Sequence, residues 1–401
     1  METTQQKLPH VVFETSLGMG HLLAVVELAK RLVHHQGFLV TFIIITTDGS
    51  SIKPQKAVLE ALPSSISSIF LPPCHGFHCE LPGDVRMTQI ALTVLAETTR
   101  LVALVVDLFG IDAFDVAKEF GVLSFFCFPT TAMVLPLTFD LRKLDEKFSC
   151  EYRDLLEPVK LPGCVSIHGS DFPDHFQDRR NEAYKSFVFS SKRLHVADGI
   201  KVDSFMDLEP SAFEDLKKGG KGKPPVYFVG LLIRSVSDGG VDESECLRWL
   251  DKQPNGLVLY VSFGSGGTLS NQQLNELALG LEMSRQRFLW VVQSPHETAA
   301  NASYFSKTKE VGLVVPSWAP QIQVLMSHGS TGGFLTHCGL NSILESIMHG
   351  VPMIAWPLFV EQRVNSKKIK ELKHAAEKAL SKEGSSTKSL ADVAQLWKSQ
   401  K

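Results

Sequence analysis

The sequence predicts an α/β protein of two doubly wound domains, each built on a parallel sheet with helices on both faces. Three observations support this prediction. The chain has 401 residues, more than one hydrophobic core usually holds. Runs of β-branched and apolar residues alternate with stretches of helical spacing, as in parallel strands that are buried on both faces. The alternation stops at 235–243, a segment rich in Ser, Gly and Asp, and then starts again.

The first series contains four expected strands and two expected helices, each marked by its apolar periodicity. In chain order these are the strand 10–15, the helix 22–33, the strands 38–46 and 101–107, the helix 113–120 and the strand 123–128. The uncharged run 121–139 is almost of membrane-spanning length. It contains Pro129, Pro136 and three threonines, so we interpret it as a buried strand, a turn and the start of a helix.

The second series repeats the pattern and ends in two helices. Its expected elements are the strand 258–263, which ends in Gly264-Ser265-Gly266-Gly267, the helix 271–283, the strands 288–293, 312–315 and 333–337, the helix 341–348, the strand 353–356, a Lys/Glu-rich helix at 367–380 and a helix after Ser386. We therefore expect a first doubly wound domain at 1–234, a second at 244–365, and C-terminal helices at 366–401 that pack back on the first domain.

The bulk composition argues against nucleic acid as a partner. The 40 Lys and Arg residues nearly balance 43 Asp and Glu residues, and no block of like charge provides the basic footprint that a phosphate backbone requires. The seven cysteines include no C-x-x-C pair, which indicates reduced thiols. The first nine residues lack the apolar stretch of a signal peptide. We expect a cytoplasmic monomer without stable membrane insertion.

The most informative segment runs from Trp318 to Gln362. Within it, Thr336-His337-Cys338-Gly339 ends a strand, and Asn341 and Ser342 are expected to open the next helix as cap residues. Backbone N–H groups and the positive end of that helix then converge on one point, which suits a pyrophosphate.

Two more side chains extend the expected nucleotide site. Glu345 shares a helical face with Asn341 and Ser342, where its carboxylate can accept two hydrogen bonds from a ribose diol. Trp318 offers a flat face for a base. From these residues alone the segment predicts a nucleotide site at a strand–helix turn, although Gly, Asn and Ser also occur at such turns simply as caps.

As an ordered string, this segment resembles the donor-binding signature of the plant secondary-metabolite UDP-glycosyltransferases of family 1. The resemblance extends over nearly the whole chain and implies the GT-B fold of two facing Rossmann-like domains. It implies that the domain at 1–234 binds the acceptor and that the domain at 244–365 binds the UDP-sugar donor. It implies that Trp318 stacks on uracil, that Gln321 and Glu345 hold the ribose, that Ser265, His337, Asn341 and Ser342 bind the phosphates, and that Glu361 and Gln362 bind sugar hydroxyls. The implied donor set is completed by Ala319, Leu340 and Thr131. Gln362 is typical of the family's glucose users.

The same resemblance places the acceptor side in the N-terminal half. His21, after the turn Gly18-Met19-Gly20, matches the family's general base, and Asp107 matches its carboxylate partner. A phenol must lose its proton as it attacks, and a neutral imidazole can accept it. Attack opposite the leaving UDP inverts the anomeric centre, and no metal or other cofactor is expected. Without the resemblance, His21 could be a cap or surface residue and Asp107 a helix cap.

Three other motifs have alternative interpretations. Thr130 and Thr131 could cap the next helix instead of contacting the sugar. The segment Cys74-His75-Gly76-Phe77-His78-Cys79 contains metal-ligand residue types, but it lies in an expected acceptor loop without a distant second ligand set. Ser265 lacks the G-x-S-x-G spacing of a hydrolase elbow, so nucleophilic catalysis is not expected.

The chain departs from the family pattern at several positions. Leu17 stands for the proline usually found before the glycine turn, and Leu340 stands for the usual Trp. Met326 is one extra residue, which rotates any helical turn that it enters by about 100°. Segments are missing before Leu101, after Tyr304 and after Asn365. We therefore expect an open edge on the sheet of the second domain.

The local sequence at 104–120, 160–164 and 273–280 resembles in particular that of the hydroquinone (arbutin-forming) glucosyltransferases. The resemblance implies an inverting UDP-glucose-dependent O-glucosyltransferase of small phenols that are hydroquinone-like, monolignol-like or xenobiotic. The alternative is a non-catalytic, shortened homologue that at most binds a UDP-sugar or a partner.

Overall fold

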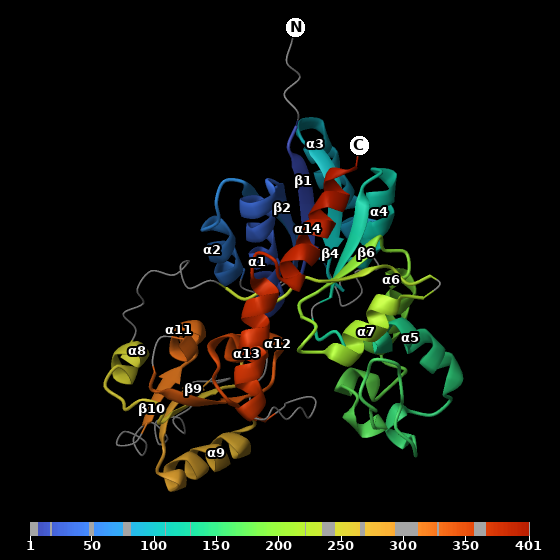
Figure 1. The fold of residues 1–401 in the computed structure, drawn as a ribbon. Coiled ribbons are helices and arrows are strands. Elements are labelled where there is room, and N and C mark those ends of the chain that lie inside the picture. The colour runs from blue at the N-terminus through green and yellow to red at the C-terminus, as the bar shows by residue number, and fades with distance from the viewer. Residues whose placement is uncertain are drawn as a thin grey trace. The chain divides into compact units, whose positions relative to one another are not determined.

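A computed structural model of the chain divides into two compact units (Figure 1). Unit 1 is Met1–Leu232 with Lys378–Lys401, and unit 2 is Ile233–Glu377. The structure describes residues 7–16, 18–47, 52–74, 82–108, 110–128, 130–220, 222–234, 245–264, 269–292, 312–326, 329–356 and 366–400. The functional domains expected at 1–234, 244–365 and 366–401 stay a prediction.

Unit 1 is built on a seven-stranded parallel sheet in the order β3-β2-β1-β4-β5-β6-β7. Its strands are β1 (Pro9–Thr15), β2 (Leu39–Thr47), β3 (Ile66–Cys74), β4 (Arg100–Val106), β5 (Leu123–Phe128), β6 (Gly199–Val202) and β7 (Val226–Phe228). The order reverses between β1 and β4. Doubly wound sheets bind ligands beyond the carboxyl ends of their strands at such a switch point. His21 and Asp107 follow these two strands.

The helices of unit 1 cover both faces of this sheet. They are α1 (Met19–Gln36), α2 (Lys53–Glu60), α3 (Pro82–Thr98), α4 (Phe114–Glu119), α5 (Val134–Lys147), α6 (Glu182–Leu194), α7 (Pro210–Lys218) and α14 (Ser385–Lys398), and α13 (Ser366–Leu380) crosses the division between the units. Apolar residues of α3, α4 and α5 pack on one face, where Leu92, Phe114 and Leu135 contact strand residues such as Leu104 and Phe126.

The other face of this sheet packs against α1 and the C-terminal helix α14, which lie side by side although they are far apart in the sequence (Figure 1). Trp397 of α14 is fully buried, and its ring meets those of Phe38 and Phe125 edge-on, with centroid distances of 6.0 and 5.1 Å. Arg100 of β4 donates to the carbonyl oxygen of Gln400 at 2.6 Å. The C-terminal helix is therefore part of the core of unit 1.

A buried lysine lies within this core. The side chain of Lys201 in β6 is fully buried, with its Nζ 4.7 Å from the ring centroid of Trp397 and 4.9 Å from that of Phe13. Within the described part of the chain, Nζ has no hydrogen-bond partner. Burial lowers the pKa of Lys201 to about 7, against a smaller opposing effect of Cys127. Folding therefore disfavours the charged form of this side chain.

We expect Lys201→Met to stabilise unit 1 near pH 7 and to remove a pH dependence. Between the folded pKa of about 7 and the ordinary value of 10.5, the unfolded chain keeps a proton that the folded chain has lost. The free energy of unfolding therefore rises with pH in this window, by at most about 1.4 kcal/mol per pH unit from this group. Urea unfolding at several pH values measures this slope. An exposed control, Lys118→Met, should keep the wild-type slope, and a Lys201→Met variant that also keeps it contradicts the prediction.

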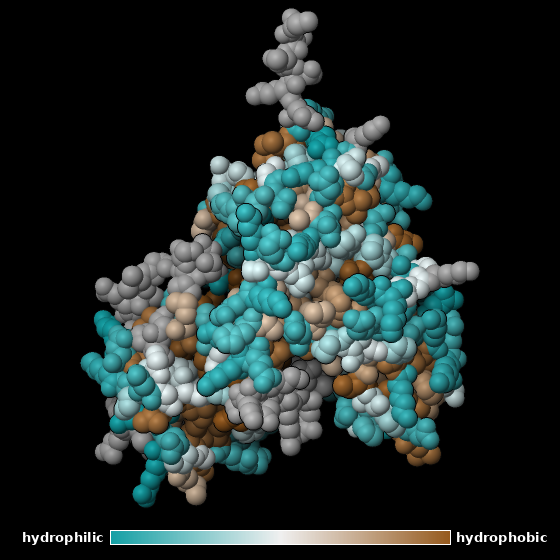
Figure 2. All heavy atoms as spheres, in the orientation of Figure 1, coloured by the Kyte–Doolittle hydropathy of each residue, from teal (hydrophilic) through white to brown (hydrophobic). Residues whose placement is uncertain are grey.

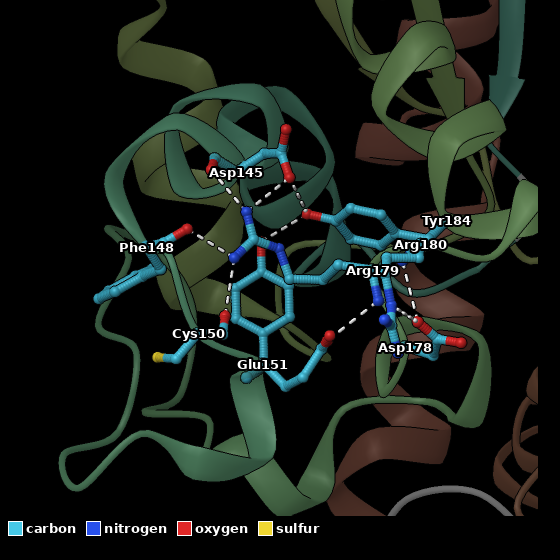
Figure 3. A network of polar contacts seen from close by, with 9 residues as sticks. Asp145, Phe148, Cys150, Glu151, Asp178, Arg179, Arg180 and Tyr184 are labelled. Atoms are coloured by element: carbon cyan, nitrogen blue, oxygen red, sulfur yellow. Dashed lines mark hydrogen bonds and ion pairs between the residues drawn. The ribbon is translucent and has the colours of Figure 1, made fainter.

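The irregular segment after α5 is held by Arg179 (Figure 3). The guanidinium donates to the Asp145 carboxylate at 2.7 Å and to the carbonyl oxygens of Phe148 and Cys150 at 2.5 and 2.7 Å. Tyr184 of α6 donates to the same carboxylate at 2.8 Å. Burial alone raises the pKa of Asp145, but the hydrogen bonds from Arg179 and Tyr184 outweigh it and lower the pKa. One cation thus connects α5, the following segment and α6.

Unit 2 contains a five-stranded parallel sheet in the order β10-β9-β8-β11-β12. Its strands are β8 (Val258–Ser262), β9 (Arg287–Val292), β10 (Gly312–Pro316), β11 (Thr331–Thr336) and β12 (Met353–Ala355), and its helices include α8 (Glu245–Leu250), α9 (Asn271–Ser284), α11 (Gln321–Met326) and α12 (Leu340–His349). The switch point lies between β8 and β11, immediately before Gly264 and His337. Within the described sheet β12 is an edge strand, and Ile354 on it is 54% exposed.

The two parallel sheets confirm the predicted fold class, and the run 121–139 forms β5, a turn and the start of α5 as expected. Among the helices that the structure describes, none combines the length and apolarity needed to cross a membrane. The face in Figure 2 is mostly hydrophilic with scattered hydrophobic patches, which is ordinary for a globular surface.

Candidate functional site

In unit 1 the structure brings His21 and Asp107 to the turn that follows β1. His21 is half-buried at the third position of α1, whose N-cap is Gly18, and Asp107 is buried directly after β4. Ser16 lies between them: its backbone N–H donates to Asp107 Oδ2 at 2.7 Å, and its Oγ is 3.5 Å from His21 Nδ1. Thr15 Oγ1 also donates to Asp107 Oδ2, at 3.2 Å. The sequence prediction missed Ser16, although its place between a strand end and a glycine turn could have indicated it.

Thr131 is half-buried between β5 and α5. The alternative that Thr130 or Thr131 caps α5 is wrong, because the N-cap residue of this helix is Met133. The Met133 side chain makes no capping hydrogen bond. The carboxylate of Glu209 instead accepts from the backbone N–H groups of Ala132 and Met133, at 2.9 and 2.8 Å. A role of Thr131 in sugar binding stays a prediction.

In unit 2 the structure brings together three of the predicted donor residues. Gln321 Nε2 donates to Glu345 Oε2 at 2.7 Å and to Ser342 Oγ at 3.1 Å. The hydroxyl of buried Tyr260 in β8 approaches Gln321 Oε1 at 3.4 Å. Tyr260 was missed by the sequence analysis because nothing distinguishes it from other core residues of its strand. The first turn of α11 and one face of α12 thus share a polar cluster.

The carboxyl group of Glu345 sits in a desolvated position. Burial raises the pKa of Glu345 to about 7, and the hydrogen bond from Gln321 opposes this shift. The group therefore changes between an acceptor-only carboxylate and a protonated form near neutral pH. In its ionised form it can accept hydrogen bonds from a diol.

His337 is enclosed by two glycines. A Cβ atom at Gly264 would come within 2.5 Å of His337 Cε1, and one at Gly339 within 2.4 Å of His337 Nε2. Gly264 also has a left-handed backbone, with φ of 74°. Burial lowers the pKa of His337, so the imidazole is neutral at neutral pH. The glycines let the chain fold closely around a ring at the switch point of this sheet.

The predicted helix cap at Asn341 and Ser342 is wrong. Helix α12 begins at Leu340, and its N-cap is Gly339, which makes no side-chain cap hydrogen bond. Gly339 has the extended backbone of a cap residue, with φ of −60° and ψ of 143°, and its missing side chain leaves room for His337. Asn341 and Ser342 therefore lie in the first turn, where backbone N–H groups favour an anion.

Trp318 follows β10 and is 66% exposed, so its ring is available for stacking, whereas Ala319 beside it is buried. Ser317 before it and Cys338 beside His337 both have φ of 65°, a left-handed conformation that is strained for residues other than glycine. Such strain occurs preferentially at functional sites. Both turns of the predicted donor site contain one such residue.

The extra residue Met326 is the last residue of α11, and Gln321 is the first. Because Met326 follows Gln321 in the helix, it does not rotate the Gln321 side chain about the helix axis. The predicted site residues Ser265, Glu361 and Gln362 lie outside the described residues, as do Leu17 and the segment 75–79 of the alternative metal site. Within the described ranges, no group of three metal-ligating side chains is present.

Solved structures resemble the whole chain. One is UGT2 of Phytolacca americana, solved as a complex with UDP-2fluoro-glucose and pterostilbene, with a TM-score of 0.88, 43% identity, and coverage of 97% of this chain and 100% of that one. Another is a UDP-glucosyltransferase from Polygonum tinctorium capable of glucosylating indoxyl, in a complex with 3,4-dichloroaniline, with a TM-score of 0.89, 42% identity, and coverage of 98% and 99%. The fold is thus that of a GT-B glycosyltransferase.

Sequence comparisons identify the family within this class. Residues 242–398 match the family described as UDP-glucoronosyl and UDP-glucosyl transferase. Hydroquinone glucosyltransferase of Rauvolfia serpentina is 49% identical over 463 positions, which cover 97% of this chain and 98% of that protein. UDP-glycosyltransferase 72B1 of Arabidopsis thaliana is 46% identical, with coverage of 99% and 98%. The chain belongs to the plant UDP-glycosyltransferases. Because the first alignment has 463 positions and the chain only 401 residues, the relative contains segments that this chain lacks.

Proposed function

We propose that this chain transfers glucose from UDP-glucose to the hydroxyl of a small phenol in one inverting step. The observation that carries the proposal is the cluster of Gln321, Ser342 and Glu345 at the start of α11 and on α12. The carboxylate and the amide of this cluster suit the hydroxyls of a ribose. They lie beside the N-terminus of α12, which has no side-chain cap and suits the pyrophosphate joined to that ribose. Exposed Trp318 supplies the stacking face for the uracil.

The acceptor phenol is proposed to bind to unit 1, because the proposed base His21 belongs to that unit. His21 takes the proton of the phenol, and the resulting nucleophile attacks the anomeric carbon of glucose while the bond to UDP breaks. Neutral His337 and the first turn of α12 hold the diphosphate as it accumulates charge. Support for a phenolic acceptor comes from relatives, one named a hydroquinone glucosyltransferase and one solved with pterostilbene. Ser265, Thr131, Glu361 and Gln362 are proposed to complete the donor site.

Product stereochemistry tests the single displacement. The α-linked glucose of UDP-glucose should appear as a β-glucoside of hydroquinone, with one UDP released per glucoside. The coupling constant of the anomeric proton in an NMR spectrum distinguishes the two configurations. An α-glucoside would overturn the one-step mechanism.

Replacement of Glu345 should weaken donor binding and remove its pH dependence. Glu345→Ala is expected to cost about 1.5–3 kcal/mol, because charge-assisted hydrogen bonds to the ribose are lost. In the wild type, affinity should rise as the pH increases through about 7, since the carboxyl then loses its proton and becomes a pure acceptor. Calorimetry with UDP-glucose measures both effects, because its diphosphate carries no terminal group that titrates near neutral pH.

Two variants make the Glu345 experiment specific. Glu345→Gln keeps the shape of the side chain and should bind weakly with no pH dependence. Glu282→Gln, on the exposed surface of α9, should bind as the wild type does. Unchanged affinity in Glu345→Ala would show that this face of α12 does not contact the ribose.

A second candidate function is that of a non-catalytic homologue that binds a UDP-sugar. The shorter chain and the 54% exposure of Ile354 on the edge strand β12 favour this candidate. It predicts donor binding without turnover, so measuring binding and glucoside formation on one preparation separates the two functions.

A further inference from the structure

The turn between β1 and α1 contains a serine whose two polar groups face different partners. The backbone N–H of Ser16 donates to the buried carboxylate of Asp107 at 2.7 Å, while its hydroxyl lies 3.5 Å from Nδ1 of His21. Thr15 adds a second hydrogen bond to the same oxygen of Asp107. Asp107 therefore fixes the backbone at Ser16, and the Ser16 side chain is in turn placed against the imidazole.

The orientation of the imidazole is set by the same turn. A Cβ atom at Gly18 would lie 3.8 Å from both Cγ and Nδ1 of His21, so this side of the ring folds back over the turn. Nε2 is on the opposite side of the ring from this contact. It is thus the nitrogen available to an acceptor hydroxyl.

A base that acts through Nε2 needs its other ring proton on Nδ1. The tautomer of a histidine is set by the hydrogen bond of the nitrogen that does not react. We propose that Ser16 is a positioning residue: its hydroxyl oxygen accepts from Nδ1–H and holds His21 in the tautomer with a lone pair on Nε2. The proposal rests on the proposed function, in which His21 is the base.

The proton balance of the step is simple in this arrangement. The phenolic proton moves to Nε2, the phenol oxygen forms a bond to the anomeric carbon, and UDP leaves with the electron pair of the broken bond. The imidazolium keeps its Nδ1–H on Ser16 Oγ, and the Nε2 proton is later lost to water. In the described part of this turn, the Asp107 carboxylate accepts from Ser16 and Thr15. The carboxylate of the nearby Glu14 accepts from Thr88 of α3 on the other face of the sheet.

Steady-state kinetics of Ser16→Ala and Ser16→Thr test the proposal. Ser16→Ala should lower kcat by about 10-fold or more, since general-base assistance is worth about 10²–10⁴-fold in full. The KM for UDP-glucose should not change. The acid limb of the pH profile of kcat/KM for the phenol should move to lower pH, because the imidazolium loses its Nδ1 acceptor. Ser16→Thr keeps a hydroxyl and should restore both rate and profile.

Controls separate this proposal from the proposed function. Ser64→Ala, on the exposed surface of unit 1, should behave as the wild type. Ser16→Cys keeps the size of the side chain but offers a weak acceptor, so it should show the same shift of the acid limb even if Ser16→Ala folds poorly. A wild-type chain that makes no glucoside refutes the proposed function. An active wild type with unchanged kcat and acid limb in Ser16→Ala and Ser16→Cys overturns the role of Ser16 alone.

Discussion

His21→Ala should lower the turnover of hydroquinone by about 10²–10⁴-fold, the usual contribution of a general base. The imidazole lies at the carboxyl end of β1, at the switch point of the unit 1 sheet. The proposed donor residues Gln321, Ser342 and Glu345 belong to unit 2. The affinity for UDP should therefore stay nearly unchanged, so the loss appears in kcat rather than in donor binding.

A matched control uses the opposite end of the same helix. His35 is exposed in the last turn of α1, and His35→Ala should keep full turnover. The assignment of His21 fails if His21→Ala loses UDP affinity and turnover to the same extent, because the residue would then belong to the donor site.

Trp397→Ala should destabilise unit 1 by about 3–5 kcal/mol, the range for removing a large buried aromatic side chain. The ring is fully buried between α1 and the sheet, in contact with Phe38 and Phe125. Since domains have only about 5–15 kcal/mol of stability, this single change removes a large part of it. Urea unfolding followed by far-UV circular dichroism measures the loss.

Two further variants control for the substitution itself. Trp397→Phe keeps an aromatic ring and should lose an intermediate amount of stability. Lys388→Ala changes an exposed residue of the same helix and should stay within about 0.5 kcal/mol of the wild type. If Trp397→Ala unfolds at the wild-type urea concentration, α14 does not stabilise unit 1.

The fold could be predicted where strands are apolar and central. β5 was predicted with its exact bounds, because five of the six residues at 123–128 are apolar and the strand lies inside the sheet. β3 was missed, because Ser67, Ser68 and two prolines interrupt its pattern; as an edge strand it tolerates them. β6 was missed because it contains a buried lysine, which only tertiary packing explains.

The site could be predicted one residue at a time, but not as a set of contacts. Gln321 and Glu345 were predicted from their motif, and the hydrogen bond between them depends on the packing of α11 against α12. The cap at Gly339 was mispredicted because sequence preference favours Asn and Ser, whereas the close approach of His337 requires a residue without a side chain. Ser16 and Tyr260 act through partners distant in sequence, which a local pattern does not reveal.

Turnover by this shorter chain distinguishes a catalyst of glucose transfer from a protein that only binds the donor. Purified protein is incubated with UDP-glucose with and without hydroquinone, and UDP and glucoside are quantified together. We expect many glucosides per protein molecule, equal amounts of UDP, and no UDP above background when hydroquinone is omitted. Binding of UDP-glucose without any glucoside from hydroquinone or other small phenols would contradict it and identify the chain as a non-catalytic homologue.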